Sequence, residues 1–339
     1  MMVDLRAWFR GPTAPAPDPT TDETQCLFVS TKGLMKLCDL HQPLPNEPAK
    51  RWPTRILAQH RPGGRIYVHA TALADFARRA LPRIETPFVL VSGNHVAEIS
   101  ARNLGEGLMA RILDHPHLIR WYAQNLAMSH PRLHPMPLGL DYHTIASHGR
   151  PDWGAQASPV AQEALLMRLR AEVPPLEERD PLSYSNWHFM PENGDRADVL
   201  QALPPGVTFY EPEPLERAAS WKRNAGYAFT ISPRGRGMDC HRTWEAIVLG
   251  AVPVIPDLPI NGLLETLPVV IVRDWRTVTR EFLAAERKRL LTTEFDFAPV
   301  LLNYWRRQLC GETKLPSLVM TYQEFMGLGA AELAQHQIP

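Results

Sequence analysis

The stretch from Tyr227 to Trp275 constrains the fold of this chain more than any other part. It holds three short apolar runs, at residues 227–232, 252–255 and 269–272, and a helical pattern that begins near Asp239. Apolar runs of this length flanked by Gly and Pro are typical of buried parallel strands. The order strand, Gly-rich turn, helix, strand, helix, strand predicts an α/β unit whose ligand lies beyond the carboxyl ends of the strands.

The rest of the chain predicts a second unit of the same kind. With 339 residues, the chain is long enough for two domains of about 150 residues each. Alternating strand and helix patterns indicate an N-terminal α/β domain over residues 24–150 and a second domain over 182–312. We expect a flexible leader over 1–23, a linker with a surface helix over 151–181, and a C-terminal helix over 313–339 that returns to the first domain.

Charge and cysteine usage bear on the partners of the chain and on its cellular compartment. The chain has 36 Lys and Arg and 36 Asp and Glu, so no net charge recruits nucleic acid or an anionic membrane. Four scattered cysteines without CxxC spacing suit a reducing compartment. No signal region and no apolar segment of about 18 residues is visible. We therefore expect a cytoplasmic protein without a transmembrane segment, which leaves room for peripheral contact with a membrane.

The turn after the first apolar run, SPRGRG, is suited to an anion. Gly235 and Gly237 permit positive φ and a close approach of the backbone to a ligand. The N-terminus of the following helix presents free N–H groups, and Asp239 is expected to cap it. The Asp239 carboxylate would repel a phosphate, so a diphosphate needs cations, which Arg side chains supply as bidentate forks. The cations at hand are Arg234, Arg236 and Arg242.

The helix after the turn carries a second polar element. Arg242 and Glu245 share one stripe near its start, where a carboxylate can accept hydrogen bonds from a ribose diol. Taken alone, the two residues favour a surface ion pair, but beside the SPRGRG turn they favour the ligand site. A dinucleotide-binding turn is the competing interpretation, because Gly235-x-Gly237 is followed by Asp257 about 20 residues on. The third glycine of that motif is missing, and no GK[ST] follows to make a P-loop.

Residues 229–275 also carry a recognisable pattern of three elements. These are the PRG turn at 233–235, the Arg242–Glu245 spacing, and the Gly-x-x-Pro-Val strand at 250–254. Together they resemble the nucleotide-sugar-binding half of exostosin-like glycosyltransferases. The resemblance implies a GT-B architecture, with two facing Rossmann-like domains, a cleft between them, and the donor bound mainly by the second domain.

The resemblance also implies roles for individual residues. It places Arg234, Gly235 and Gly237 near the donor diphosphate, Arg242 beside it, and Glu245 on the ribose. The predicted donor-binding residues are Asn186, Ser232, Arg234, Gly235, Gly237, Asp239, Arg242 and Glu245. No DxD motif is present, which implies no metal ion and no cofactor besides the nucleotide-sugar donor. The implied reaction is transfer of a sugar to a hydroxyl of a glycan or lipid-linked saccharide, with inversion.

An inverting reaction needs a proton acceptor from the first domain. His95 and Glu98 follow one predicted strand, and Asp141 and His143 follow the MPLGL segment. We take Asp141 and His95 as the candidate bases, against the plainer interpretations of a turn residue and a loop residue. Members of the resembled family carry an Asp near the position of His95, and this sequence departs from that pattern. A binding protein that has lost its base, or an NAD(P)-dependent oxidoreductase, are the rival functions.

Overall fold

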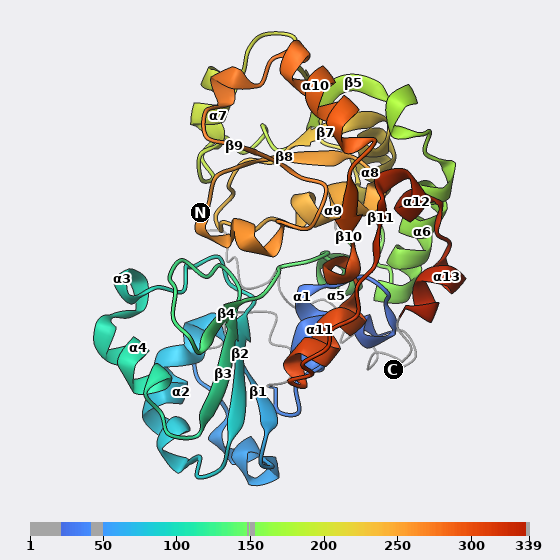
Figure 1. Ribbon diagram of the computed structural model, residues 1–339. Helices are drawn as coiled ribbons and strands as arrows, with labels where there is room; N and C mark the ends of the chain where they lie inside the picture. The colour runs from blue at the N-terminus through green and yellow to red at the C-terminus, as the bar shows by residue number, and fades with distance from the viewer. Residues whose placement is uncertain (1–21, 42–49, 148, 150–152, 337–339) are drawn as a thin grey trace, which may run out of the picture.

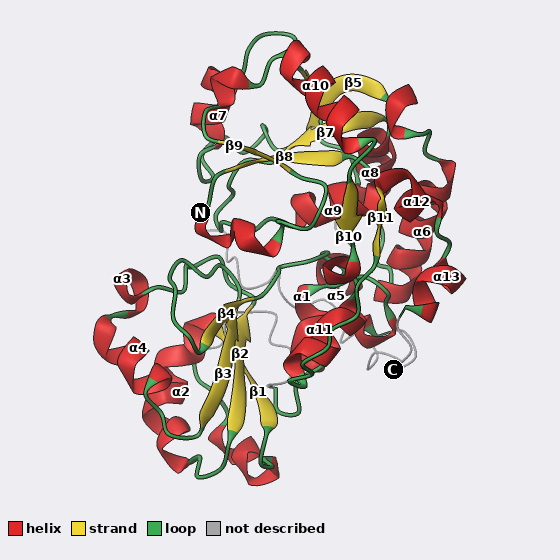
Figure 2. Ribbon diagram, viewed as in Figure 1, coloured by secondary structure: helices red, strands yellow, loops and turns green. Residues whose placement is uncertain are grey.

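The structure, a computed structural model, describes residues 22–41, 50–147, 149 and 153–336. The leader predicted over residues 1–23 lies outside these ranges except for its last two residues. Two parallel sheets, each accompanied by helices, face one another across the middle of the molecule (Figure 1, Figure 2). The predicted α/β fold class is therefore confirmed, with two Rossmann-like domains in the facing arrangement of the GT-B type. No helix within the described ranges is both long and apolar enough to cross a lipid bilayer.

The first domain is built on a four-stranded parallel sheet of order β1-β2-β3-β4. Alternate side chains of β1 face opposite layers, as the two-residue period of a strand requires. Ile66 and Val68 pack under α2 and α4, whereas Tyr67 packs against the layer that contains α1 and α11. The strands are β1 (Gly64–His69), β2 (Phe88–Gly93), β3 (Leu118–Ala123) and β4 (Leu133–Pro135), and the helices are α1 (Thr31–Lys36), α2 (Leu73–Arg79), α3 (Ala101–Leu104), α4 (Glu106–Leu113) and α5 (His143–Ser147).

The second domain contains a five-stranded parallel sheet of order β6-β5-β7-β8-β9. The order reverses between β5 and β7, and ligands of open α/β sheets bind at such a switch point, beyond the carboxyl ends of the strands. The strands are β5 (Asp180–Ser185), β6 (Thr208–Tyr210), β7 (Tyr227–Ile231), β8 (Val252–Pro256) and β9 (Val270–Val272). The helices are α6 (Pro159–Glu172), α7 (Arg196–Ala202), α8 (Arg217–Ala225), α9 (His241–Leu249) and α10 (Arg280–Leu290). The three apolar runs of the sequence are thus β7, β8 and β9.

The C-terminal part of the chain differs from the prediction. The helix that lies on the first domain is α11 (Leu302–Leu309), where the hydroxyl of Tyr122 donates to the Gln308 carbonyl at 3.2 Å. The described part of the segment predicted to return, 313–336, instead packs on the second domain, where the Tyr322 hydroxyl lies 3.0 Å from the Ile247 carbonyl oxygen of α9 and 3.1 Å from that of Ala251. Its elements are β11 (Val319–Thr321), which pairs with β10 (Glu294–Asp296), α12 (Tyr322–Gly327) and α13 (Ala330–Gln335).

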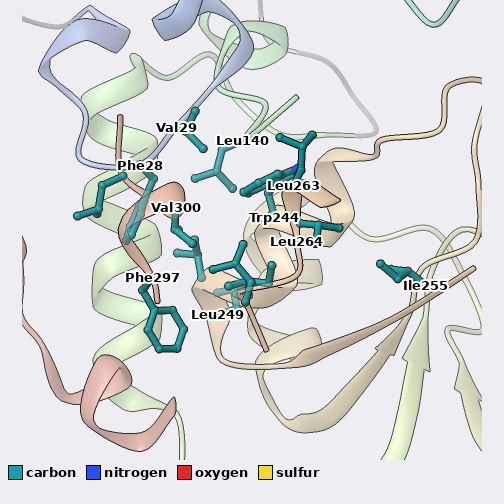
Figure 3. Packing of buried hydrophobic residues seen from close by; sticks show 14 of the residues in the cluster. Phe28, Val29, Leu140, Trp244, Leu249, Ile255, Leu263, Leu264, Phe297 and Val300 are labelled. Carbon is teal, nitrogen blue, oxygen red and sulfur yellow. The ribbon is translucent and has the colours of Figure 1, made fainter. Parts of the chain in front are cut away.

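One apolar core is shared by the two domains (Figure 3). Phe28, Val29 and Leu140 of the first domain belong to the same buried cluster as Trp244 and Leu249 of α9. Burying a large apolar side chain contributes about 1.5–3 kcal/mol, so this core stabilises one relative orientation of the domains.

Gly139 packs against the backbone of Val29 in this core, where there is no room for a side chain. Its φ is +67°, and a Cβ would lie 2.4 Å from the carbonyl oxygen of Val29. We expect Gly139→Ala to lower the free energy of unfolding by about 2–4 kcal/mol, because strained backbone and a backbone clash add. Urea unfolding measures the change.

Gly107 in α4 is the matched control. An added Cβ there meets no atom within 4 Å, and its φ is not positive. Gly107→Ala should leave stability unchanged or raise it by up to about 1 kcal/mol through helix propensity. Equal stability of the two variants would show that the close contact at Gly139 is absent.

Candidate functional site

The turn after β7 rests on the loop that follows β5. Gly194 of that loop has φ +65°, and a Cβ on it would lie 2.3 Å from the Gly235 carbonyl oxygen and 2.5 Å from that of Arg234. The Arg236 Nε donates to the Asn193 Oδ1 at 2.9 Å. Only glycine allows this backbone-to-backbone contact, so the two loops at the switch point form one rigid unit.

A cavity of about 330 Å³ opens beside this unit and is rich in charge. It is lined by Gly194, Asp195, Asp198, Arg234, Gly235 and Arg236. Arg196 lies next to it, and burial together with the nearby Arg242 lowers the pKa of Arg196 to about 10, which leaves it charged at neutral pH. Within the described ranges no three His, Cys, Asp or Glu side chains are grouped to hold a metal ion. The cations that these residues supply at the cavity are arginines.

Arg242 lies under the turn and is held there by two acceptors. Its Nη2 donates to the Pro233 carbonyl at 2.7 Å, and its Nε donates to the Ser232 hydroxyl at 3.2 Å. Ser232 is buried and also shares a hydrogen bond of 2.8 Å with the Thr243 hydroxyl. Ser232, predicted to bind the donor, therefore has its hydroxyl engaged within the protein, where it positions the Arg242 guanidinium.

Asp239 does not cap α9, contrary to the prediction. The N-cap is Cys240, which makes no side-chain cap hydrogen bond. The buried Asp239 carboxylate instead accepts from the backbone N–H of Leu138, at 2.6 Å, and from the indole N–H of Trp244, at 2.9 Å. A contact with the other domain has taken the carboxylate, so the first N–H groups of α9 have no side-chain cap, and such groups bind anions.

Gly237 is needed for a close approach rather than for positive φ. Neither Gly235 nor Gly237 has a φ in the left-handed region, which corrects that part of the prediction. A Cβ on Gly237 would lie 3.0 Å from the Asn125 Oδ1, which also accepts from the Asp239 N–H at 3.0 Å. Asn125 has a φ of 52° and belongs to the first domain. Sequence reasoning missed Asn125, because nothing in its local pattern marks it.

Arg234 connects the cavity to the first domain. Its Nη2 lies 2.7 Å from the Glu98 Oε1, in the loop after β2, and both side chains are partly exposed. A carboxylate thus occupies one face of the guanidinium in this structure. A phosphate group is also anionic and presents a pair of oxygens that can accept from a guanidinium, so Arg234 has a fork already placed for an anionic ligand.

Two predicted donor-binding side chains differ in their freedom. Asn186 donates through Nδ2 to the Ser220 hydroxyl at 2.8 Å, which fixes its amide against α8. Glu245, half-buried on α9, has no hydrogen-bond or ion-pair partner in the described part of the chain. The charges of Glu245 and Arg242 are close enough for Glu245 to raise the pKa of Arg242 against the lowering by burial. Glu245 is therefore an acceptor near Arg242 that makes no hydrogen bond within the described ranges.

Asp141 is a poor base in this structure, contrary to the prediction. Its carboxylate lies 3.1 Å from Nη2 of Arg217 on α8 and 3.0 Å from Nδ1 of His143, and it accepts from the Thr144 N–H at 3.0 Å. Burial alone would raise its pKa, but His143, His241 and Arg217 hold it well below the usual range. A carboxylate so strongly stabilised as an anion has little tendency to take a proton.

Two histidines near the carboxyl edge of the first sheet remain as candidate bases. His95 follows β2 as predicted, and its Nδ1 accepts from the Ala97 N–H at 3.1 Å. His143 begins α5 with a side chain 27% exposed, and its ring lies 5.9 Å from that of His241. Burial lowers the pKa of His143 to about 4, although Asp141 opposes this shift. His143 is therefore neutral at pH 7, and its buried Nδ1 lies close to the Asp141 carboxylate without forming a hydrogen bond to it.

Comparisons with known proteins give only distant likenesses. No protein-family model matches the chain, and no curated protein sequence matches it. A solved structure described as an OtsA apo structure is 12% identical with a TM-score of 0.37, and covers 77% of this chain and 76% of its own. An α1,3-fucosyltransferase crystal structure is 11% identical with a TM-score of 0.34, and covers 90% of this chain and 95% of its own.

Buried histidines at this site predict loss of stability in acid. Burial lowers the pKa of both His69 and His143 from 6.5 to about 4. Between pH 6.5 and 4 the unfolded chain binds more protons than the folded chain. The free energy of unfolding therefore decreases as the pH is lowered, by about 1 kcal/mol per pH unit for each histidine. The effect of Asp141, whose pKa is depressed, appears only below about pH 4. Urea unfolding at pH 7, 6 and 5 measures this slope.

His69→Asn should reduce the slope of the free energy of unfolding against pH by the contribution of one histidine, about 1 kcal/mol per pH unit. The exposed His336 provides the control, because His336→Asn changes no buried group. If the His69 and His336 variants retain the same pH dependence, His69 is not held neutral by burial.

Proposed function

We propose that this chain is a glycosyltransferase that binds a nucleoside diphosphate sugar at the second domain and transfers the sugar to a hydroxyl. One observation carries the proposal. The N-terminus of α9 has no side-chain cap, and Arg234 and Arg242 converge on the turn before it, at the switch point of a parallel sheet. That combination is suited to a diphosphate.

The proposed role of each group depends on whether its side chain already has a hydrogen-bond partner in the protein. Arg234 and the first N–H groups of α9 bind the diphosphate, and Arg242, fixed by Pro233 and Ser232, adds charge behind the turn. Glu245, which lacks a partner in the described ranges, accepts from the ribose hydroxyls. As the glycosidic bond breaks, negative charge grows on the leaving diphosphate, and preorganised donors of this kind stabilise it. In this proposal arginines and the helix terminus do the work of a metal ion.

The acceptor is proposed to be a hydroxyl of a glycan or lipid-linked saccharide, attacked with inversion. This finer statement rests on the sequence resemblance. The first domain supports it by presenting polar side chains at the carboxyl edge of its sheet, across from the donor turn. His95, Glu98 and His143 all come from this edge or from the adjoining loop.

The proton acceptor is proposed to be His143, in place of Asp141 and His95. His143 is neutral at pH 7, is partly exposed, and has the Asp141 carboxylate 3.0 Å from its Nδ1. A carboxylate this close stabilises the imidazolium that forms when the ring takes the proton of the acceptor hydroxyl, although no hydrogen bond joins Asp141 to Nδ1 in this structure. Asp141 then acts through His143, and Arg217 fixes Asp141 in turn.

Nucleotide binding tests the donor site. Thermal-shift screening against UDP, GDP, dTDP, NAD and NADP should show stabilisation by a nucleoside diphosphate. Glu245→Gln should then weaken that ligand roughly tenfold or more, because a hydrogen bond to a charged group contributes about 1.5–3 kcal/mol. The exposed Glu265 supplies the control variant Glu265→Gln, with unchanged affinity.

Two outcomes contradict this proposal. Stabilisation by NAD or NADP alone would support the dinucleotide interpretation of Gly235-x-Gly237. Equal affinity of the Glu245 and Glu265 variants would remove Glu245 from the site.

Hydrolysis of the bound nucleotide sugar, with water as acceptor, tests the base. His143→Ala should reduce its kcat at least about a hundredfold, the usual range for loss of a general base, without changing nucleotide affinity. His95→Ala is the matched comparison and should retain most of the rate. The reverse order of the two variants would return the role to His95. Donor binding by the wild type with no hydrolysis or transfer would favour a binding protein.

A further inference from the structure

Lys32 is a nearly buried cation that the donor site does not use. It lies on α1 and is only 5% exposed, yet its Nζ has no hydrogen-bond acceptor or ion-pair partner in the described part of the chain. Lys36 on the same helix, by contrast, contacts both Asp22 and Glu23. An ammonium group donates three hydrogen bonds. The stem of Lys32 is buried while its Nζ still reaches solvent, so the acceptors left for it are water or a bound ligand.

Lys32 follows the segment at which the two domains meet. The Thr31 hydroxyl donates to the Leu138 carbonyl at 2.7 Å, and Ser30 forms backbone bridges with Gly139. The Gly139 carbonyl in turn accepts from Nδ1 of His241, the first residue of α9, at 2.6 Å. Figure 1 shows α1 and α5 next to each other alongside the first sheet, on the flank that also carries α11. Lys32 thus lies in the first domain, close to the segment that contacts the start of α9.

The charged groups around Lys32 do not neutralise it. Glu23 and Asp141 are the carboxylates close enough to raise its pKa, and each is already paired, with Lys36 and with Arg217. Lys32 itself contributes to lowering the pKa of His69 and of His143, so both rings are near it and neutral at pH 7. These groups face Lys32 from α1, from the segment before it, from β1 and from α5. One positive charge therefore remains without a counter-charge.

We propose that the Lys32 ammonium binds a phosphate group of a substrate held between the two domains. The proposal rests on the proposed glycosyl transfer and adds a ligand contact from the first domain. The phosphate has two sources, the donor diphosphate bound at the α9 turn or a phosphate carried by the acceptor. Either one supplies the anionic oxygens that the Lys32 ammonium lacks.

Calorimetric titration of the full chain tests the contact, with inorganic pyrophosphate as the donor probe and inorganic phosphate, added in excess pyrophosphate, as the acceptor probe. Lys32→Met removes the charge at similar length, and Lys32→Arg keeps it. The exposed Lys288 on α10 provides the control Lys288→Met. Lys32→Met should weaken one probe at least tenfold, Lys32→Arg should recover part of the affinity, and Lys288→Met should change neither.

The probe that is lost identifies the source. Weaker pyrophosphate binding assigns Lys32 to the donor diphosphate, and weaker phosphate binding alone assigns it to the acceptor. Unchanged binding of both probes to Lys32→Met overturns the proposal. Weak phosphate binding by wild type that this substitution does not alter is an adventitious ion only and overturns it as well. If wild type binds a nucleoside diphosphate and Lys32→Met binds all probes equally, this inference fails while the proposed function stands.

Proton uptake provides a readout that a structural role would not move. Burial lowers the pKa of Lys32 to about 8, and a bound anion raises it again. At pH 8, titrations in buffers of different ionisation enthalpy should show more proton uptake for wild type than for Lys32→Met. His69 and His143, with pKa values near 4, do not titrate there. Equal proton uptake by the two proteins contradicts an anion on Lys32.

Discussion

The buried carboxylate of Asp239 is the interaction on which the arrangement of the site depends. It accepts from the Leu138 backbone and from the Trp244 indole, while the Asp239 N–H donates to Asn125. A buried charge is tolerated only when such partners surround it, so the turn, the start of α9 and the first domain keep one geometry. Because this carboxylate is used between domains, the N-terminus of α9 has no side-chain cap, and the proposed anion site follows from that.

The facing surfaces also share their charges. Arg234 of the second domain pairs with Glu98 of the first, and Arg217 pairs with Asp141. The first pair is partly exposed and weak enough for a phosphate to compete with it, whereas the second is buried and fixes the segment that carries His143. The same kind of contact therefore serves two ends: one arginine can exchange its partner for a ligand, and the other holds a reacting group in place.

The pattern of apolar residues along the sequence predicted the strands of the second sheet. The apolar runs at 227–232, 252–255 and 269–272 are strands of a parallel sheet, because buried parallel strands read as short apolar segments. Asp239 does not cap α9 and Asp141 is stabilised as an anion, since each carboxylate is taken by a partner about 75 to 100 residues away in sequence. Asn125 was missed for the same reason, and no periodicity shows which helix of the C-terminal part crosses to the first domain.

Hydrogen–deuterium exchange with a bound nucleoside diphosphate tests the central claim most directly, namely that the turn after β7 and the uncapped start of α9 bind the diphosphate. The account predicts that the ligand slows exchange of the amides at residues 234–243, together with the loop after β5 that packs on them. Protection centred instead on residues 256–258, at the end of β8, or no protection of the α9 amides by a ligand that binds, would contradict it.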